Sequence, residues 1–141
     1  MYWRYLKETI ENNALEILRL YVGAFLLLKG VQFLTHPDLI TNLVSGHVIL
    51  IWNAIIAHYI VLAHLVGGTL LVIGLSTRLA ALAQIPILSG AVFLVHLEEG
   101  LLGYNQSLEY ASLMLIILII LSITGSKSWS VDTYVQDQDP L

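Results

Sequence analysis

The sequence lacks cysteine altogether and has few charged residues. Without cysteine the chain cannot form disulfides, thiolate metal sites, iron–sulfur ligation or a dithiol relay. Lys and Arg number only 6, against 10 Asp and Glu, and the formal net charge is −4. The broad basic surface that nucleic-acid binding requires is therefore missing, and no nucleic-acid partner is expected.

Hydrophobic residues are what the sequence has in abundance. They make up 57% of the 141 residues, whereas charged residues make up 11%, and the mean hydropathy is +0.81. A soluble domain carries about 25% charged residues. This composition excludes an ordinary water-soluble globule and predicts an integral membrane protein, for which the lipid bilayer is the first expected partner.

Four stretches are long and apolar enough to cross a bilayer, whose hydrocarbon core of about 30 Å needs roughly 20 residues of helix. They are residues 17–34, 54–75, 79–97 and 108–124. Only Ser76, Thr77 and Arg78 separate the second and third, which predicts a tight transmembrane hairpin. The predicted fold is all-α: an interfacial segment at 1–15, a four-helix membrane bundle at 16–129 and a loose polar tail at 130–141.

Glycine spacing suggests how these helices meet. Gly23 and Gly30 are seven residues apart in the first span, and Gly67 and Gly74 repeat this spacing in the second. Two helical turns bring such positions back to one face, where small residues allow close backbone contact. We expect these glycine faces to carry helix packing.

The orientation follows from the positions of Lys and Arg near short loops. Basic residues occur in the N-terminal segment, in the turn at Arg78 and in the tail at Lys127, whereas residues 35–53 and 98–107 contain none. This distribution predicts that both termini are cytoplasmic.

Charges within or beside the spans need partners. Lys29 and Glu109 lie at matching predicted depths, so they either form a structural ion pair or leave Glu109 as a proton acceptor tuned by the lysine. Arg19, near the opposite face, is expected to pair with Glu16, Asp132 or lipid phosphates. We class Arg19, Lys29, Arg78 and Asp132 as structural charges.

The histidines are the candidates for chemistry. His58 and His96 lie at the same predicted depth on adjacent helices, beside Asn105 and Glu109. Such a group could exchange protons with a quinone ring, or ligate a metal or haem iron. We place a quinone pocket at these four residues and assign no metal site. His64, near the middle of its span, can be buried as a neutral ring if its N–H meets a carbonyl.

The order and spacing of several motifs resemble the DoxX family of small four-helix bacterial membrane proteins. The strongest stretch is 67–82, with its double glycine, glycine-leucine and Thr-Arg-Leu-Ala-Ala hairpin. Supporting positions are Arg19 with Gly23, Lys29 with Gly30, His96, Asn105, Glu109, Gly125 with Ser126, and Asp132. Where family members typically carry a glutamate just before the double glycine, this chain has His64.

The resemblance implies a four-helix bundle in the bacterial cytoplasmic membrane with a link to redox chemistry, since some relatives are subunits of thiosulfate:quinone oxidoreductases. The leading hypothesis is a membrane subunit of a quinone-linked redox system, and any enzymatic activity would be that of an oxidoreductase subunit. The alternative is a non-catalytic scaffold that binds other membrane subunits, or copies of itself, through its glycine-rich faces. A small-solute transporter is a third and weaker reading, because four spans are few for one.

Overall fold

The computed structural model describes residues 2–45, 50–97, 100, 106–126 and 129–136, and every element in these ranges is helical. The elements are α1 (Tyr2–Thr35), α2 (Pro37–Ser45), α3 (Leu50–Ile73), α4 (Thr77–Gly90), the π-helix η1 (Ala91–His96), α5 (Ser107–Thr124) and α6 (Val131–Gln136).

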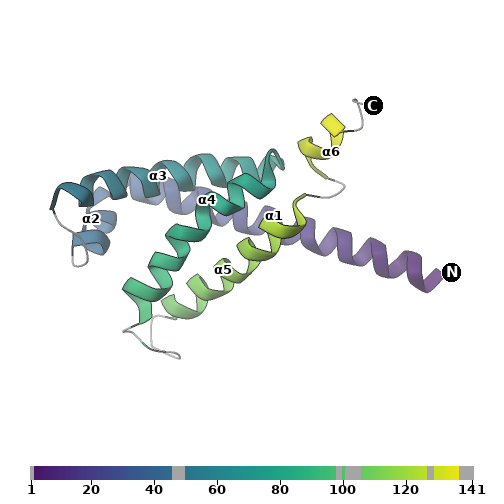
Figure 1. The fold of residues 1–141 in the computed structure, drawn as a ribbon, viewed down its shortest axis with the longest axis horizontal. Coiled ribbons are helices and arrows are strands. Elements are labelled where there is room, and N and C mark those ends of the chain that lie inside the picture. The colour runs from purple at the N-terminus through teal and green to yellow at the C-terminus, as the bar shows by residue number, and fades with distance from the viewer. Residues whose placement is uncertain (1, 46–49, 98–99, 101–105, 127–128, 137–141) are drawn as a thin grey trace.

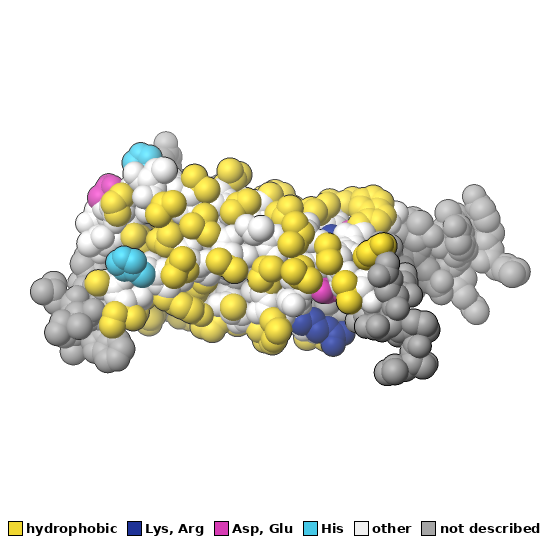
Figure 2. Space-filling view, turned by 90° about the horizontal axis from the view of Figure 1, so that it is seen from above, with side chains coloured by type: hydrophobic (Ala, Val, Ile, Leu, Met, Phe, Trp, Pro, Cys, Tyr) yellow, Lys and Arg dark blue, Asp and Glu magenta, His cyan; other side chains and the backbone are white. Residues whose placement is uncertain are grey.

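Four helices are long and apolar enough to cross a membrane: Asn13–Thr35, Ala54–Ile73, Thr77–His96 and Ser107–Thr124. The predicted all-α, four-helix membrane fold is confirmed. Figure 2 shows hydrophobic side chains covering the middle of one face, with charged side chains and histidines toward its two ends. This pattern is expected of a surface whose middle lies in hydrocarbon and whose ends lie near water. The chain is thus a multi-pass membrane protein in contact with lipid.

The helices are arranged as two pairs (Figure 1). α1 lies along α3, and α4 with η1 lies along α5. The pairs meet where α3 turns into α4 and diverge toward the other end, where α2 packs beside α1 and α3. The start of α1 and the short α6 both lie toward the end where the pairs meet, as an even number of crossings requires. We call this the Arg19 end and the opposite one the His96 end.

Glycines allow α1 and α3 to pack with their backbones almost in contact. A Cβ atom placed on Gly68 would lie 2.6 Å from the Leu27 backbone nitrogen, and one on Gly23 would lie 2.8 Å from that of Val72. Gly30 meets Leu65 in the same way, at 2.9 Å. Gly67 faces α4, with the Gln84 side chain against it. Gln84 is fully buried and donates a hydrogen bond to the Ala63 carbonyl, which ties α4 to α3.

Gly74 has a different role from the predicted one. Its φ of +71° belongs to the left-handed region, and the N–H groups of Gly74 and Leu75 both donate to the Leu70 carbonyl, at 2.9 and 3.0 Å. Glycine is favoured at this position because a Cβ would be strained there. Gly74 therefore ends α3 instead of packing on a helix face, and α3 stops at Ile73, two residues before the predicted end of its span.

Arg19 is buried, with 1% of its surface exposed, and joins three segments at the Arg19 end. Its guanidinium pairs with the equally buried Glu16 at 2.6 Å. It also donates to the carbonyls of Leu71 and Val72 at the end of α3, at 2.5 and 3.1 Å, and to that of Trp129 at 2.6 Å. A cation is well placed here, because the last carbonyls of a helix carry partial negative charge and have no helical partner.

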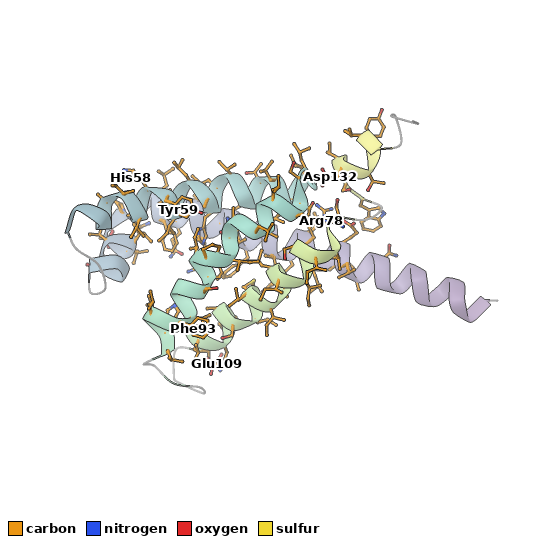
Figure 3. All side chains as sticks on the ribbon, in the orientation of Figure 1. His58, Tyr59, Arg78, Phe93, Glu109 and Asp132 are labelled. Atoms are coloured by element: carbon orange, nitrogen blue, oxygen red, sulfur yellow. The ribbon has the colours of Figure 1, made fainter. Side chains whose placement is uncertain are left out.

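Asp132 caps α4 from a distant part of the chain. Its carboxylate accepts hydrogen bonds from the N–H groups of Ser76 and Thr77, at 2.7 and 3.1 Å, and from the Ser126 hydroxyl at 3.1 Å. Burial by itself raises the pKa of Asp132, but these hydrogen bonds outweigh it and hold the pKa below its usual range. Arg78 lies nearby (Figure 3), exposed, with its side chain against Gly125.

The C-terminal segment differs from the loose tail that was predicted. Residues 131–136 form α6, and the Asp132 N–H donates to the Gly74 carbonyl at 3.0 Å. The prediction missed this because a polar sequence does not reveal that one of its carboxylates matches the unpaired N–H groups of a helix elsewhere in the chain.

Candidate ligand cavity

A cavity of about 790 Å³ lies toward the His96 end, between the two helix pairs. Pockets that bind small molecules or cofactors have volumes of about 300–1,000 Å³ and walls that are mostly apolar. The walls here come from all four spanning segments and from α2. The wall includes Phe25, Lys29 and Phe33 from α1, Ile40 from α2, Ile60 and His64 from α3, Ile87 and His96 from α4 and η1, and Tyr110 and Met114 from α5.

The third span changes its helical geometry beside this cavity. α4 contains Pro86, which has no N–H to donate, and five residues later the π-helix Ala91–His96 begins. Wider helical turns of this kind are rare and occur often at functional sites. His96 is the last residue of η1 and lines the cavity.

Lys29 also lines the cavity, half-buried, one turn before the wall residue Phe33. Its ammonium donates to Gln32 Oε1 on the same helix, at 3.1 Å. The hydrogen bond found for Lys29 in the described part of the chain thus goes to Gln32, and no ion pair between Lys29 and Glu109 is found there. Glu109 lies outside the wall, in the first turn of α5, where a carboxylate is favoured by the partial positive charge of the helix N-terminus.

His64 is the most buried titratable side chain in the wall, with 6% of its surface exposed. Its Nδ1 lies 2.8 Å from the Ile60 carbonyl, and its ring meets that of Phe33 edge to face, with the centroids 5.6 Å apart. A carbonyl only accepts hydrogen bonds, so Nδ1 carries the proton. This is the buried, carbonyl-bonded ring that the sequence allowed.

His58 does not lie in the cavity. Its side chain is exposed on the side of α3 that faces away from α4 and α5 (Figure 3), and its Nδ1 lies 2.6 Å from the Ala54 carbonyl. Asn105 is outside the described residues. Of the three described residues among the four placed together from the sequence, the structure puts His96 in the wall of this cavity and leaves His58 and Glu109 outside it. It adds His64 and Lys29 to the wall, which the sequence had indicated as structural.

A signal for His64 was present in the sequence. His64 precedes Gly68 by four residues, which is one helical turn, so the two share a face. Since the double glycine packs against the neighbouring helices, a histidine one turn away faces the interior of the bundle. His58 is six residues from His64 and points elsewhere. Among the described residues, no group of three or more His, Asp or Glu side chains is arranged to hold a metal ion.

The fold and the cavity define a small four-helix membrane protein with a largely apolar interior site. The DoxX family model matches residues 14–97, more than half of the chain, and the chain belongs to this family. It is also 34% identical over 79 residues to the Bacillus subtilis (strain 168) protein named "Putative oxidoreductase CatD". The match covers 56% of this chain and 57% of that relative, so the chain spans little more than half of the relative's length. No solved structure matches the chain.

Proposed function

We propose that this chain is a membrane subunit of a quinone-linked redox system and that the cavity holds the quinone headgroup. The observation that carries the proposal is the composition of the wall, in which the polar side chains of Lys29, His64 and His96 are set among aromatic and aliphatic ones. Support comes from the family and from the printed name of the relative, which is that of an oxidoreductase.

The residues fit the group chemically. A quinone ring is flat and apolar, with two carbonyl oxygens that need hydrogen-bond donors, and it supplies the capacity to take up two electrons and two protons. Phe25, Phe33 and Met114 provide apolar surface for a ring, and the Lys29 ammonium is a donor at the same site. His96 provides an imidazole that can hold a proton near the ring. The apolar walls exclude water and strengthen each of these polar contacts.

The direct test is quinone binding by the purified protein in lipid nanodiscs, with 2,3-dimethyl-1,4-naphthoquinone as the probe. His96→Leu removes the hydrogen-bonding ring of a wall residue and should weaken binding about tenfold, the effect of one buried hydrogen bond. His58→Leu is the matched control, because it makes the same change on the exposed face and should change binding less than about twofold. Absence of binding by the wild type, or equal losses in both variants, would overturn the proposal.

The alternative of a scaffold that binds partners through glycine faces receives less support. Gly23, Gly30, Gly67 and Gly68 are all occupied by contacts within the chain, so they offer little surface to another subunit. Partner subunits and homo-oligomers therefore have to be sought on other surfaces.

We further propose the orientation that the charge distribution predicts, with both termini in the cytoplasm and the His96 end outside. Since the chain has no cysteine, single-cysteine variants report accessibility without background. A cysteine at the exposed Gln106 should react with an impermeant maleimide in intact cells, whereas one at Thr133 should react only after the inner membrane is opened. The reverse pattern would invert the topology.

A further inference from the structure

We propose that the cavity prefers the reduced, hydroxyl-bearing form of its ligand, a hydroquinone, and that His64 sets this preference. This inference rests on the proposed function, because it concerns which redox form the same site binds better.

The backbone determines which His64 nitrogen accepts. Nδ1 must donate to the Ile60 carbonyl, 2.8 Å away, so in the neutral imidazole Nε2 carries the lone pair and accepts. A charged ring would place a second cation beside Lys29 in a largely apolar cavity, which is unfavourable. No second hydrogen bond of the His64 side chain is found within the described part of the chain. The wall therefore offers an acceptor at Nε2.

Lys29 lies at the level of His64. Gly30, the next residue along α1, packs against Leu65, the next residue along α3, where a Cβ would lie 2.9 Å from the Leu65 nitrogen. Phe33, one turn from Lys29, touches the His64 ring. The cavity thus brings a donor, the Lys29 ammonium, and an acceptor, His64 Nε2, to one depth on neighbouring helices.

A donor beside an acceptor suits a phenolic hydroxyl better than a carbonyl. The hydroxyl proton can be given to His64 Nε2 while the ring oxygens accept from Lys29. A quinone carbonyl can accept from Lys29 but offers nothing to Nε2, so the buried acceptor would lose its hydrogen bond to water without gaining another. Sites built to bond a hydroxyl discriminate strongly against analogues that lack it, for this reason.

The test compares two pairs of probes on the protein in nanodiscs. The first pair is 2,3-dimethyl-1,4-naphthoquinone and its dithionite-reduced hydroquinone. The second is 2-methyl-1-naphthol and its methyl ether, in which a methyl group replaces the hydroxyl proton without any redox change. We expect the hydroxyl form to bind about tenfold more tightly in both pairs, as one hydrogen bond in a buried site predicts.

Three variants locate the effect. His64→Phe keeps a ring against Phe33 and removes the acceptor. The hydroxyl and non-hydroxyl forms should then bind about equally tightly, while the quinone still binds. His64→Gln restores an acceptor and should recover part of the preference, which also guards against a folding defect in His64→Phe. His58→Phe is the matched control on the exposed face and should retain the full preference.

The outcomes separate this inference from the proposed function. Equal binding of the hydroxyl and non-hydroxyl forms by the wild type, or a full preference in His64→Phe, would overturn the inference and leave a quinone site standing. If neither member of the quinone pair bound, the proposed function itself would fail, and the inference with it. Decanoate, an apolar chain that ends in a carboxylate, is the competitor that tests ligand class. We expect decanoate to displace the hydroquinone only at concentrations much higher than that of the hydroquinone. Tighter binding of decanoate than of the hydroquinone would contradict a quinone-type ligand.

Discussion

The two ends of this bundle use polar residues in opposite ways. At the Arg19 end polar groups of the chain bond to one another: the buried Arg19 to Glu16 and to the carbonyls of α3, and the partly buried Asp132 to the N–H groups of Ser76 and Thr77. Toward the His96 end the helix pairs diverge, and Lys29, His64 and His96 line a cavity of about 790 Å³. The ion pair and hydrogen bonds of the Arg19 end thus hold the helices together, and the cavity lies toward the His96 end, where the helices diverge.

This contrast shows how to tell structural polar residues from candidate ligand-binding ones. In a membrane, every buried polar group must find a partner, so a charge alone does not indicate function. Arg19 has its partners within the chain. His64 donates a hydrogen bond from Nδ1 to a backbone carbonyl, and its second ring nitrogen has no such bond within the described part of the chain, in a side chain that lines the cavity. The comparison predicts that changes at the Arg19 end affect stability first and that changes in the cavity affect binding first.

The largest loss of stability is expected from Arg19→Met. This change leaves the buried Glu16 carboxylate without its guanidinium and removes the donors to Leu71 and Trp129. Breaking a buried ion pair from one side typically costs about 3–5 kcal/mol. Arg78→Met, at an exposed arginine on the same end, is the control and should cost less than about 0.5 kcal/mol. Unfolding free energies in mixed micelles measure both, and similar values would show that the network at this end contributes little.

A smaller loss is expected where α1 and α3 touch. In Gly68→Ala the new methyl group would lie 2.6 Å from the Leu27 nitrogen, so the helices must move apart. Overpacking of this kind costs about 1–3 kcal/mol. Gly90→Ala is the matched control, because nothing lies within 4 Å of its Cβ position. An equal effect of the two substitutions on the unfolding free energy would argue against close α1–α3 packing.

The next loss of stability is expected from removing the side chain that caps α4. Asp132→Ala removes the acceptor for the N–H groups of Ser76 and Thr77, and losing a capping side chain costs about 0.5–2 kcal/mol. The effect should depend on pH. Because the pKa of Asp132 is lowered in the folded protein, its stabilisation is complete above the unfolded value of about 3.9 and is lost as the pH falls through the folded pKa.

The difference in unfolding free energy between wild type and Asp132→Ala should therefore be constant from about pH 7 to pH 5 and shrink below about pH 4. A difference that grew on acidification would mean that the carboxylate is not held in its charged form by these hydrogen bonds.

The smallest change in stability should come from filling the cavity. Ala91→Phe adds a ring at a half-buried wall position and should alter the unfolding free energy by less than about 1 kcal/mol, since it occupies space that is already open. Binding of the naphthoquinone probe should nevertheless fall at least about tenfold. Strong destabilisation with unchanged binding would reverse the roles assigned to the two ends.

The sequence predicted the four spans because apolar length alone determines whether a helix can cross the bilayer. It also indicated Gly23 and Gly30 as packing positions. It misjudged Gly74, since a glycine that ends a helix and one that packs on a face can have the same spacing. It placed His58 with His96 because residue counting gives depth and not direction around the helix. The cavity could not be predicted, because it depends on how far the helix pairs diverge and on the π-helix at Ala91–His96.

Photolabelling tests the division between the ends most directly. The wild-type protein in nanodiscs would be irradiated with an azido-substituted naphthoquinone, with and without excess 2,3-dimethyl-1,4-naphthoquinone, and the labelled residues mapped by mass spectrometry. We expect competed labelling in residues 25–42, 60–64, 87–96 and 107–114, and none in residues 74–78 or 124–133. Competed labelling at the Arg19 end, or label spread evenly over the lipid-facing surface without competition, would contradict a ligand site at the His96 end.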